Sequence, residues 1–348
     1  MSRSKSATMG TLLLVSAMAL AGTALAQQGE GYFKGKTVTI AVAGTVGSGL
    51  DNGARMVARY IGKYLPGNPT LRVEPMPGAG GVRLLELLYS AVPPKDGSYI
   101  GAFATGPIME PLMSDRPAQY KTSDFTAVGA MEKSMSFCVT WQTSPIKTMK
   151  DAQAREVTVA GTGAASSTDI FPIVLNATLG SKFRLISGYV GTQETLMAIE
   201  RGETDGRCGW SWSSIRSSKP DWLRDKKLNF LVQLGLEKHP EVNEDVPLAL
   251  DLIPNEAGKQ MMRVLIAPQQ ITRPYLAPPG LPADRMAEIR GAFMSAMKDE
   301  GLRAEFVKVV GEEPSPTSGE DMQRLIQDIY ATPPAVVARL KDVLKGAK

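Results

Sequence analysis

The sequence predicts an α/β protein of two domains with a ligand cleft between them. Strand-like and helical runs alternate along the chain, which is typical of α/β architecture with mainly parallel sheets. Glycine-rich loops follow a strand and precede a helix at three distant places. Without a predicted signal peptide of 26 residues, 322 of the 348 residues remain. A chain of this length usually folds around two hydrophobic cores, so two domains are expected.

The first 26 residues have the pattern of a secretory signal peptide. Arg3 and Lys5 precede a run of small and apolar residues at 9–21, and residues 24–26 read Ala-Leu-Ala, a cleavage signal. The alternative, a membrane anchor, needs about 20 apolar residues, and this run is shorter. We therefore expect export to the periplasm, with cleavage after Ala26 and a mature chain that begins at Gln27.

The charge of the chain argues against nucleic-acid binding. Its 39 Lys and Arg residues and 35 Asp and Glu residues give a formal net charge of +4, and basic residues are interspersed with acidic ones. A protein that binds nucleic acid would gather its basic residues in one patch. The sequence therefore predicts no nucleic-acid partner.

The chain has two cysteines, Cys138 and Cys208, both in strand-like apolar runs. An exported protein can oxidise such a pair, whereas spacing alone does not establish the geometry that a disulfide needs. Two buried thiols are the simpler interpretation, and a disulfide is the alternative.

The first strand–loop–helix unit is the clearest local signal. A β-branched run at 37–42 enters the glycine loop 44–49, and Asp51 opens a stretch with apolar residues at helical spacing. Glycines let the backbone approach a ligand closely, and the free N–H groups of a helix start favour an anion. This unit predicts one side of an anion-binding cleft.

Two further segments repeat this arrangement. Residues 72–76 lead into the loop 77–81 and an apolar helix, and residues 157–160 lead into the loop 161–169 and another helix. We expect the three loops to converge on one site.

Two consecutive strands mark where the chain leaves the first domain. They are expected at 125–131 and 136–141, with Glu132 and Lys133 between them, and the chain returns near 268–275. The predicted division is a first domain of residues 27–133 and 275–348 and a second domain of residues 134–274.

Four motifs occur in an order that resembles one family of receptors. They are Lys-Gly-Lys-Thr-Val-Thr-Ile at 34–40, Pro-Gly-Ala-Gly-Gly at 77–81, Pro-Lys-Asp-Gly at 94–97 and Ala-Pro-Pro-Gly-Leu-Pro at 277–282. With the glycine loop that ends in Asp51, they look like the receptors of tripartite tricarboxylate transporters, also called Bordetella uptake or Bug-type solute-binding proteins. The resemblance covers most of the mature chain.

This resemblance implies a two-domain periplasmic-binding-protein fold that closes over a small carboxylate ligand. Such a receptor needs no cofactor, metal or catalysis, and as a monomer it delivers its ligand to a large and a small membrane subunit. Backbone N–H groups, hydroxyls and water hold the carboxylate, rather than a cationic side chain. The family loops and the segment 206–212 give these predicted ligand-binding residues: Thr45, Val46, Gly47, Ser48, Gly80, Ala104, Thr105, Gly163, Ser166, Ser167, Thr168, Tyr189, Gly191, Gly209 and Trp210.

Two segments differ from the usual pattern of the family. Val46 and Ser48 stand where many relatives carry Pro or Gly, and 206–212 is richer in tryptophan. Trp210 and Trp212 share a face if the segment is extended, and there they would stack on an aromatic or apolar ligand body. The alternative is a place in the core of the second domain. The sequence therefore leaves three classes of ligand open: aliphatic acids, amino acids and aromatic acids.

Several polar residues have two interpretations. Arg207 and Arg216 either pair with a ligand carboxylate or are surface or structural charges. Asp51 either binds a ligand or caps its own helix. The hydroxyl of Tyr189 is expected to orient the ligand, and residues 166–168 can cap a helix and contact the ligand at once.

An enzymatic role finds little support in the sequence. The single histidine, His239, lies in a predicted exposed turn, and the chain has no nucleophile elbow, metalloprotease motif or Cys-x-x-Cys motif. Residues 30–37 lack the first glycine of a phosphate loop, and Asn52 stands where a dinucleotide loop has glycine. Two alternatives to a transport receptor remain: a receptor for a signalling ectodomain, and an exported enzyme that acts on a carboxylate.

Overall fold

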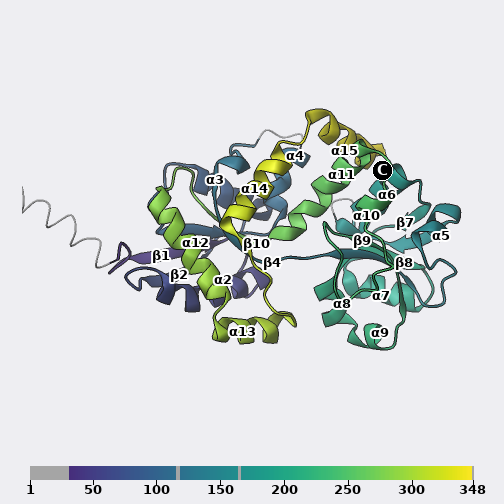
Figure 1. The fold of residues 1–348 in the computed structure, drawn as a ribbon, viewed down its shortest axis with the longest axis horizontal. Helices are drawn as coiled ribbons and strands as arrows, with labels where there is room; N and C mark the ends of the chain where they lie inside the picture. The colour runs from purple at the N-terminus through teal and green to yellow at the C-terminus, as the bar shows by residue number, and fades with distance from the viewer. Residues whose placement is uncertain (1–30, 115–117, 164–165, 347–348) are drawn as a thin grey trace, which may run out of the picture.

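The structure is a computed structural model that describes residues 31–114, 118–163 and 166–346. The predicted signal peptide, 1–26, lies outside these residues. The described chain forms two lobes, each built on its own β-sheet, which we call the first and the second lobe (Figure 1). Among the described residues, no helix is both long enough and apolar enough to cross a membrane. The predicted α/β fold is confirmed.

The first lobe contains a six-stranded sheet. In spatial order its strands are β11 (Thr317–Ser318), β4 (Thr126–Glu132), β10 (Thr272–Ala277), β3 (Tyr99–Ala102), β1 (Thr37–Val42) and β2 (Thr70–Pro75). β1 is parallel to β2 and β3, whereas β10 runs antiparallel to β3 and β4. Parallel pairing places the ends of β1 and β3 at one edge of the sheet.

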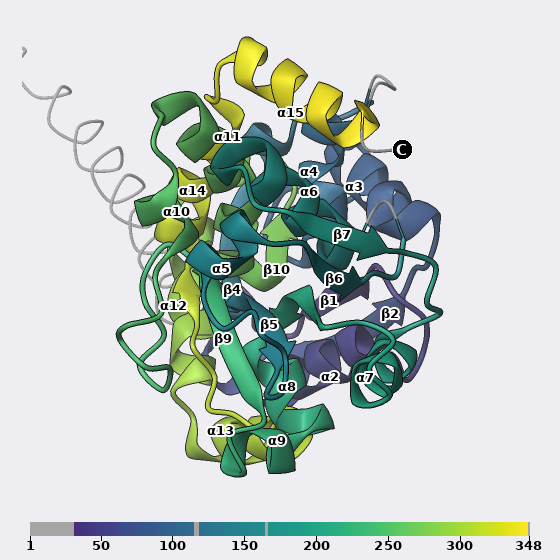
Figure 2. The same cartoon turned by 90° about the vertical axis from the view of Figure 1, so that its right-hand side faces the viewer.

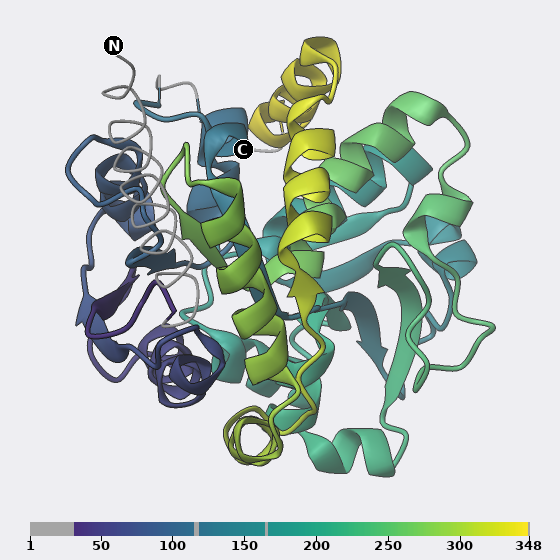
Figure 3. The same cartoon turned by 60° about the vertical axis from the view of Figure 1, so that its left-hand side comes forward.

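Helices cover both faces of this sheet because the side chains of β1 alternate in direction. Ile40 faces a core shared with α2, α12 and α13, and Ala41 faces a core shared with α3, α4 and α14. α12 and α14 lie side by side, and the Arg290 guanidinium of α12 donates to the Gly319 oxygen of α14, 3.3 Å away (Figure 3). The helices of this lobe are α2 (Gly49–Ile61), η1 (Gly62–Tyr64), η2 (Ala79–Gly81), α3 (Val82–Tyr89), α4 (Gly106–Met113), η3 (Thr122–Asp124), α12 (Ala283–Met297), α13 (Glu300–Val310) and α14 (Gly319–Tyr330).

The second lobe contains a five-stranded sheet, also covered on both faces. In spatial order its strands are β7 (Phe183–Ile186), β6 (Val157–Ala160), β8 (Gly206–Ser211), β5 (Ser136–Trp141) and β9 (Leu228–Leu234). Val159 faces a core with α6 and α11, and Val139 faces a core with α7, α8 and α9. The helices are α5 (Met149–Ala154), α6 (Ser167–Leu179), α7 (Thr192–Glu200), α8 (Trp212–Ser218), α9 (Pro220–Arg224), α10 (Ala249–Leu252), α11 (Glu256–Ile266) and η4 (Ala267–Ile271).

Both sheets are mixed, which corrects the expectation of mainly parallel sheets. β6 is parallel to β7 and β8, whereas β5 runs antiparallel to β8 and β9. The antiparallel strands β4, β5 and β10 lie where the chain passes between the lobes. Residues 133–135 join β4 to β5, and the chain returns to the first lobe through η4 into β10. An apolar strand pattern reports burial and not strand direction.

The final helix, α15 (Pro334–Gly346), packs on the second lobe, although the sequence predicted the whole tail in the first domain. It contacts α6 and α11 (Figure 2), and Leu340 belongs to the core of the second lobe. It also contacts α4 of the first lobe, where Lys341 Nζ donates to the Ser114 oxygen at 2.8 Å. α14, directly before it, lies against β4 of the first lobe. The tail is therefore a third link between the lobes, beside the two strand crossings.

A disulfide joins Cys138 of β5 to Cys208 of β8, so the simpler expectation of two buried thiols is wrong. The two strands are antiparallel neighbours, and both cysteines lie in the core next to α6. The pairing of β5 with β8 brings together residues that are 70 positions apart in the chain. No local sequence pattern reports such a pairing.

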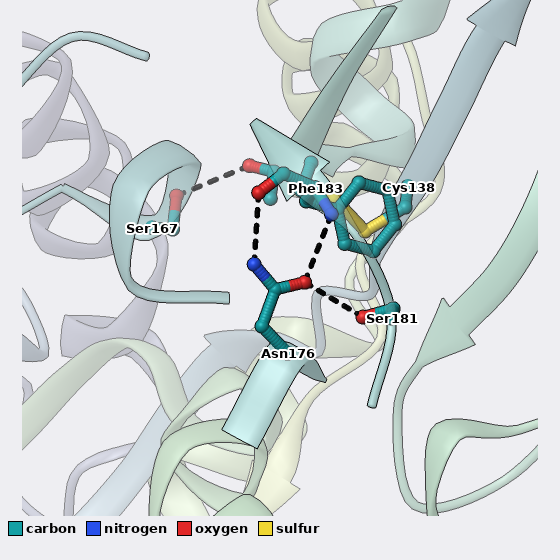
Figure 4. The surroundings of a disulfide bond; sticks show 7 residues. Cys138, Ser167, Asn176, Ser181 and Phe183 are labelled. Carbon is teal, nitrogen blue, oxygen red and sulfur yellow. Dashed lines mark hydrogen bonds between the residues drawn. A yellow bond between two sulfur atoms is a disulfide. The ribbon is translucent and has the colours of Figure 1, made fainter. Parts of the chain in front are cut away.

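Beside the disulfide, one side chain fixes the turn between α6 and β7 (Figure 4). The Asn176 amide donates to the Phe183 oxygen at 2.8 Å and accepts from the Phe183 N–H at 2.9 Å. Its oxygen also accepts from the Ser181 hydroxyl at 2.9 Å. These bonds satisfy both backbone groups of Phe183, the first residue of β7, and tie the end of α6 to the start of that strand.

We predict that joint Cys138→Ala and Cys208→Ala substitution lowers the free energy of unfolding by about 2 to 5 kcal/mol, because the bond restricts the unfolded chain. Urea denaturation followed by circular dichroism measures this change, and wild-type protein with and without reductant is the matched control. Two reactive thiols in the unfolded, unreduced protein would contradict the bond.

Candidate ligand site

In the first lobe, three loops come together at the carboxyl edge of the parallel strands. The N–H of Ala43, after β1, donates to the Ala102 oxygen at the end of β3, 2.9 Å away. A Cβ atom at Gly81 would lie 3.1 Å from Ala43 Cβ and 3.0 Å from Pro107 Cγ. Gly81 has φ +106°, so both its conformation and its surroundings require glycine. The first two glycine loops therefore lie side by side next to the start of α4, and the convergence of all three glycine loops on one site stays a prediction.

The start of α2 leaves backbone donors at this edge. Ser48 is the N-cap residue, and its hydroxyl accepts from the Asp51 N–H at 3.2 Å. The first helical hydrogen bond runs from the Asn52 N–H to the Ser48 oxygen, so the N–H groups of Gly49 and Leu50 precede it. Residues 45–47 of the loop are exposed. The N–H groups of Gly49 and Leu50 and the loop 45–47 therefore lie at the surface of the lobe.

Asp51 lies in the first turn of α2, where the cap position itself belongs to Ser48. Its carboxylate is 1% exposed and accepts from the Gly47 N–H and the Arg55 Nε, both at 2.9 Å. The hydrogen bond from Arg55 holds the pKa of Asp51 below its ordinary value, against burial, which raises it. The predicted donor of Gly47 is thus used within the loop. Oδ1 of Asp51 is buried and has no hydrogen-bond partner among the described residues.

The loop after β3 lies next to the return path from the second lobe. Ala104 is exposed and Thr105 is half-buried, and the Thr105 hydroxyl lies 3.5 Å from the Ile271 oxygen of η4. The exposed residue Gly80 belongs to η2, whose neighbour Gly81 contacts the start of α4. These predicted residues share the edge with α2.

In the second lobe, the loop 161–169 is organised by a carboxylate that the sequence did not single out. Asp169 is 2% exposed, and its Oδ1 accepts from the Gly163 N–H, the Ser166 hydroxyl and the Thr168 hydroxyl, each at 3.1 Å. The Ser187 hydroxyl donates to Oδ2. The predicted ligand groups of Ser166 and Thr168 are therefore turned toward Asp169. The sequence signal for this role was the position of Asp169, an acidic residue three positions after the N-cap residue Ser166.

Ser167 and Gly209 contact each other. The Ser167 hydroxyl donates to the Gly209 oxygen at 3.1 Å. Gly209 has φ +64°, and a Cβ atom there would lie 2.5 Å from the Ser167 carbonyl. Gly209 therefore allows β8 to approach the start of α6, and this packing role requires glycine at that position.

Trp210 lies in the core, which is the alternative that the sequence left open. Its side chain is 1% exposed, its ring packs edge-on to that of Trp222, and its Nε1 donates to the Ser214 hydroxyl at 3.0 Å. A stacking role for Trp210 at the surface is therefore wrong for this structure. Trp212 begins α8, so the two tryptophans do not share one extended segment.

The loop after β7 lies beside the loop after β6. The N–H groups of Gly188 and Tyr189 both donate to the Gly161 oxygen at 3.1 Å. Tyr189 is half-buried and Val190 is 91% exposed. Gly191 is the N-cap residue of α7, and no side chain caps that helix start. The carboxyl edge of the second sheet thus presents two helix starts, those of α6 and α7.

The two arginines have different environments. Arg216 is exposed and binds both oxygens of Glu241, at 2.9 and 3.1 Å. Arg207 is 4% exposed, and its Nη1 donates to the Thr195 hydroxyl at 2.6 Å. Its guanidinium lies 5.1 Å from the centre of the Trp210 ring. Burial lowers the pKa of Arg207 to about 10, so it is charged at neutral pH.

The segment around His239 is an exposed turn, as predicted, at residues 237, 238, 240 and 241, whereas His239 itself is half-buried. Its ring centre lies 4.5 Å from that of Trp212, and its Nδ1 accepts from the Glu241 N–H at 3.2 Å. Burial lowers the pKa of His239, against the nearby Glu241 carboxylate, which raises it. In the described part of the chain, no group of three His, Cys, Asp or Glu side chains is placed to hold a metal.

Two cavities lie away from the predicted loops. One of about 1180 Å³ is lined mainly by the second lobe, between α8, α9, β9, residues 147–150 and residues 241–247, and also by Gly311 of the first lobe. The other, about 620 Å³, lies between the lobes and is lined by Glu132 and Ser315 from the first and Trp212 and His239 from the second. Trp212 lines both cavities. It therefore keeps contact with open space, unlike Trp210.

Neither the protein-family models nor the curated proteins include a match to this sequence. Solved structures match its fold. A TctC solute-binding protein from Polaromonas, without ligand, has a TM-score of 0.68 and 16% identity, covering 89% of this chain and 98% of its own. MatC from Rhodopseudomonas palustris, with bound malate, has a TM-score of 0.53 and 20% identity, covering 88% and 98%. The periplasmic binding protein BugD has a TM-score of 0.53 and 18% identity, covering 88% and 97%.

These similarities show a shared fold. The chain has the fold of TctC-type and Bug-type periplasmic binding proteins, as the resemblance in the sequence implied. In the present structure the strand-end loops of both sheets supply helix starts, which are the groups that can bind an anion.

We predict that Asp169→Asn lowers the free energy of unfolding by about 1 to 3 kcal/mol, because an amide nitrogen would face donors that the carboxylate now satisfies. Urea denaturation measures the change. Asp225→Asn is the matched control, since Asp225 is an exposed carboxylate paired with Arg224. Equal stability of the two variants would contradict the role of Asp169.

Proposed function

We propose that this protein is a periplasmic receptor that captures a small carboxylate and delivers it to the membrane subunits of a tripartite tricarboxylate-type transporter. The observation that carries the proposal is the placement of helix starts at the carboxyl edges of both sheets: α2 and α4 in the first lobe, α6 and α7 in the second. Such edges bind ligands in open α/β sheets.

The chemistry of these edges favours an anion. The N–H groups of Gly49 and Leu50 precede the first hydrogen bond of α2, and the positive end of the helix dipole adds to their attraction. The hydroxyl of Ser48 lies at the start of α2. A solved structure of this fold holds malate, a dicarboxylate, which supports a carboxylate as the ligand class.

Capture follows from the connections between the lobes. Two strand crossings and the α14–α15 tail join them, and a ligand that contacts both lobes stabilises the closed arrangement over the open one. Release to a membrane partner then requires that the partner favour the open arrangement. This role needs reversible binding and no covalent chemistry.

We predict that malate, citrate or benzoate raises the melting temperature of the mature chain, residues 27–348, because a ligand of the folded state stabilises it by about 2.7 kcal/mol at a hundredfold excess over its dissociation constant. A thermal-shift measurement checks this, with the uncharged amide of each acid as the control. The proposal fails if no acid changes the melting temperature and native mass spectrometry finds no co-purified ligand.

We also predict that Gly49→Glu weakens binding of such an acid at least tenfold, because a fixed carboxylate in the first turn of α2 repels the anion and occupies its donors. A side chain fits at Gly49, where a Cβ atom would meet nothing within 4 Å. Isothermal titration calorimetry measures the affinity, and Gly49→Gln is the uncharged control. Equal affinities of the Glu and Gln variants would exclude the start of α2 from the site.

A further inference from the structure

Arg207 is a buried cation with no acidic partner among the described residues. It lies on β8, is 4% exposed, and its Nη1 donates to the Thr195 hydroxyl at 2.6 Å. Its Nε is buried and has no partner among the described residues. No ion pair links it to a described carboxylate, although the cost of a buried charge is usually offset by one.

The side chain of Arg207 points to the first turn of α7. Thr195, which accepts its hydrogen bond, also donates through its hydroxyl to the Thr192 oxygen at 2.7 Å. The first helical hydrogen bond of α7 runs from the Thr195 N–H to the Gly191 oxygen at 3.3 Å. The N–H groups of residues 192–194 therefore precede it, and no side chain caps them.

Two positive groups thus meet in one place. The start of a helix carries a partial positive charge, and the guanidinium of Arg207 adds a full one behind it. One acidic side chain lies in the same turn: a Cβ atom at Gly191 would be 3.5 Å from Oε2 of Glu194. Glu194 is half-buried and does not reach ion-pair distance of Arg207. The positive charge is therefore incompletely matched within the described protein.

We infer that Arg207 supplies positive charge to the anion site that the proposed function places at the start of α7. The subsite would take a carboxylate of the ligand on the N–H groups of residues 192–194, beside Tyr189 and Gly191. Arg207 lies behind the helix turn and acts through its hydrogen bond to Thr195 and through the electric field of its guanidinium. It is therefore a positioning residue that favours negatively charged ligands. This inference rests on the proposed function and deepens it.

The test compares three variants by isothermal titration calorimetry with malate, citrate and benzoate. Arg207→Met is expected to lower the affinity for the bound acid at least tenfold, and Arg207→Lys to keep it within threefold, because the charge is retained. Glu194→Gln, which removes the competing carboxylate, is expected to raise the affinity. Arg216→Met is the matched control, since it removes an exposed positive charge that is paired with Glu241.

The outcomes separate this inference from the proposed function. If wild-type protein binds an acid and Arg207→Met binds it equally well, the subsite is wrong and the receptor stands. If Arg207→Lys loses as much affinity as Arg207→Met, the role is structural and not one of charge. If Arg207→Met does not fold, Glu194→Gln decides, since an unchanged or lower affinity contradicts the subsite. If wild-type protein binds none of the acids, the proposed function fails and the inference fails with it.

Discussion

Parallel strand pairing is the constraint on which the candidate site depends. Because β1 and β3 are parallel, the loops that follow them leave from the same edge of the first sheet, and β6 and β7 do the same in the second. Glycines then bring the helix starts close to the strands. Gly81 lets α3 and α4 approach the end of β1, and Gly209 lets the start of α6 approach β8. A larger residue at either place would push a helix start away from the edge.

The parts of this arrangement that a sequence can predict are local ones. The strand–glycine–helix units at 37–61 and 157–179 were predictable because a β-branched run, a glycine loop and helical spacing all lie within a few residues. The disulfide and the burial of Trp210 were not, because both follow from the pairing of β5 with β8, which are far apart in the chain. α15 has an apolar face, but nothing local says which lobe that face covers.

The same limit applies to the loops of the candidate site. Ser166 and Thr168 are typical ligand and cap residues, and in this structure their hydroxyls satisfy Asp169, which also binds Ser187 from the neighbouring loop. A single sequence does not reveal that competition. Of the buried charges, only the one with a local partner could be predicted. Asp51 is matched by Arg55, four residues along the same helix, whereas the neighbours of Arg207 come from β8 and α7. An unmatched buried cation lowers stability, and proteins tolerate such a cost where binding needs it.

The proposed capture requires the two lobes to close over a bound acid, and small-angle X-ray scattering measures that closure. The sample is the mature chain, residues 27–348, with and without a saturating concentration of whichever of malate, citrate or benzoate stabilises it most. A smaller radius of gyration is expected with the acid, because the loops at the ends of both sheets come together on one ligand. An unchanged radius of gyration with the acid demonstrably bound would contradict it.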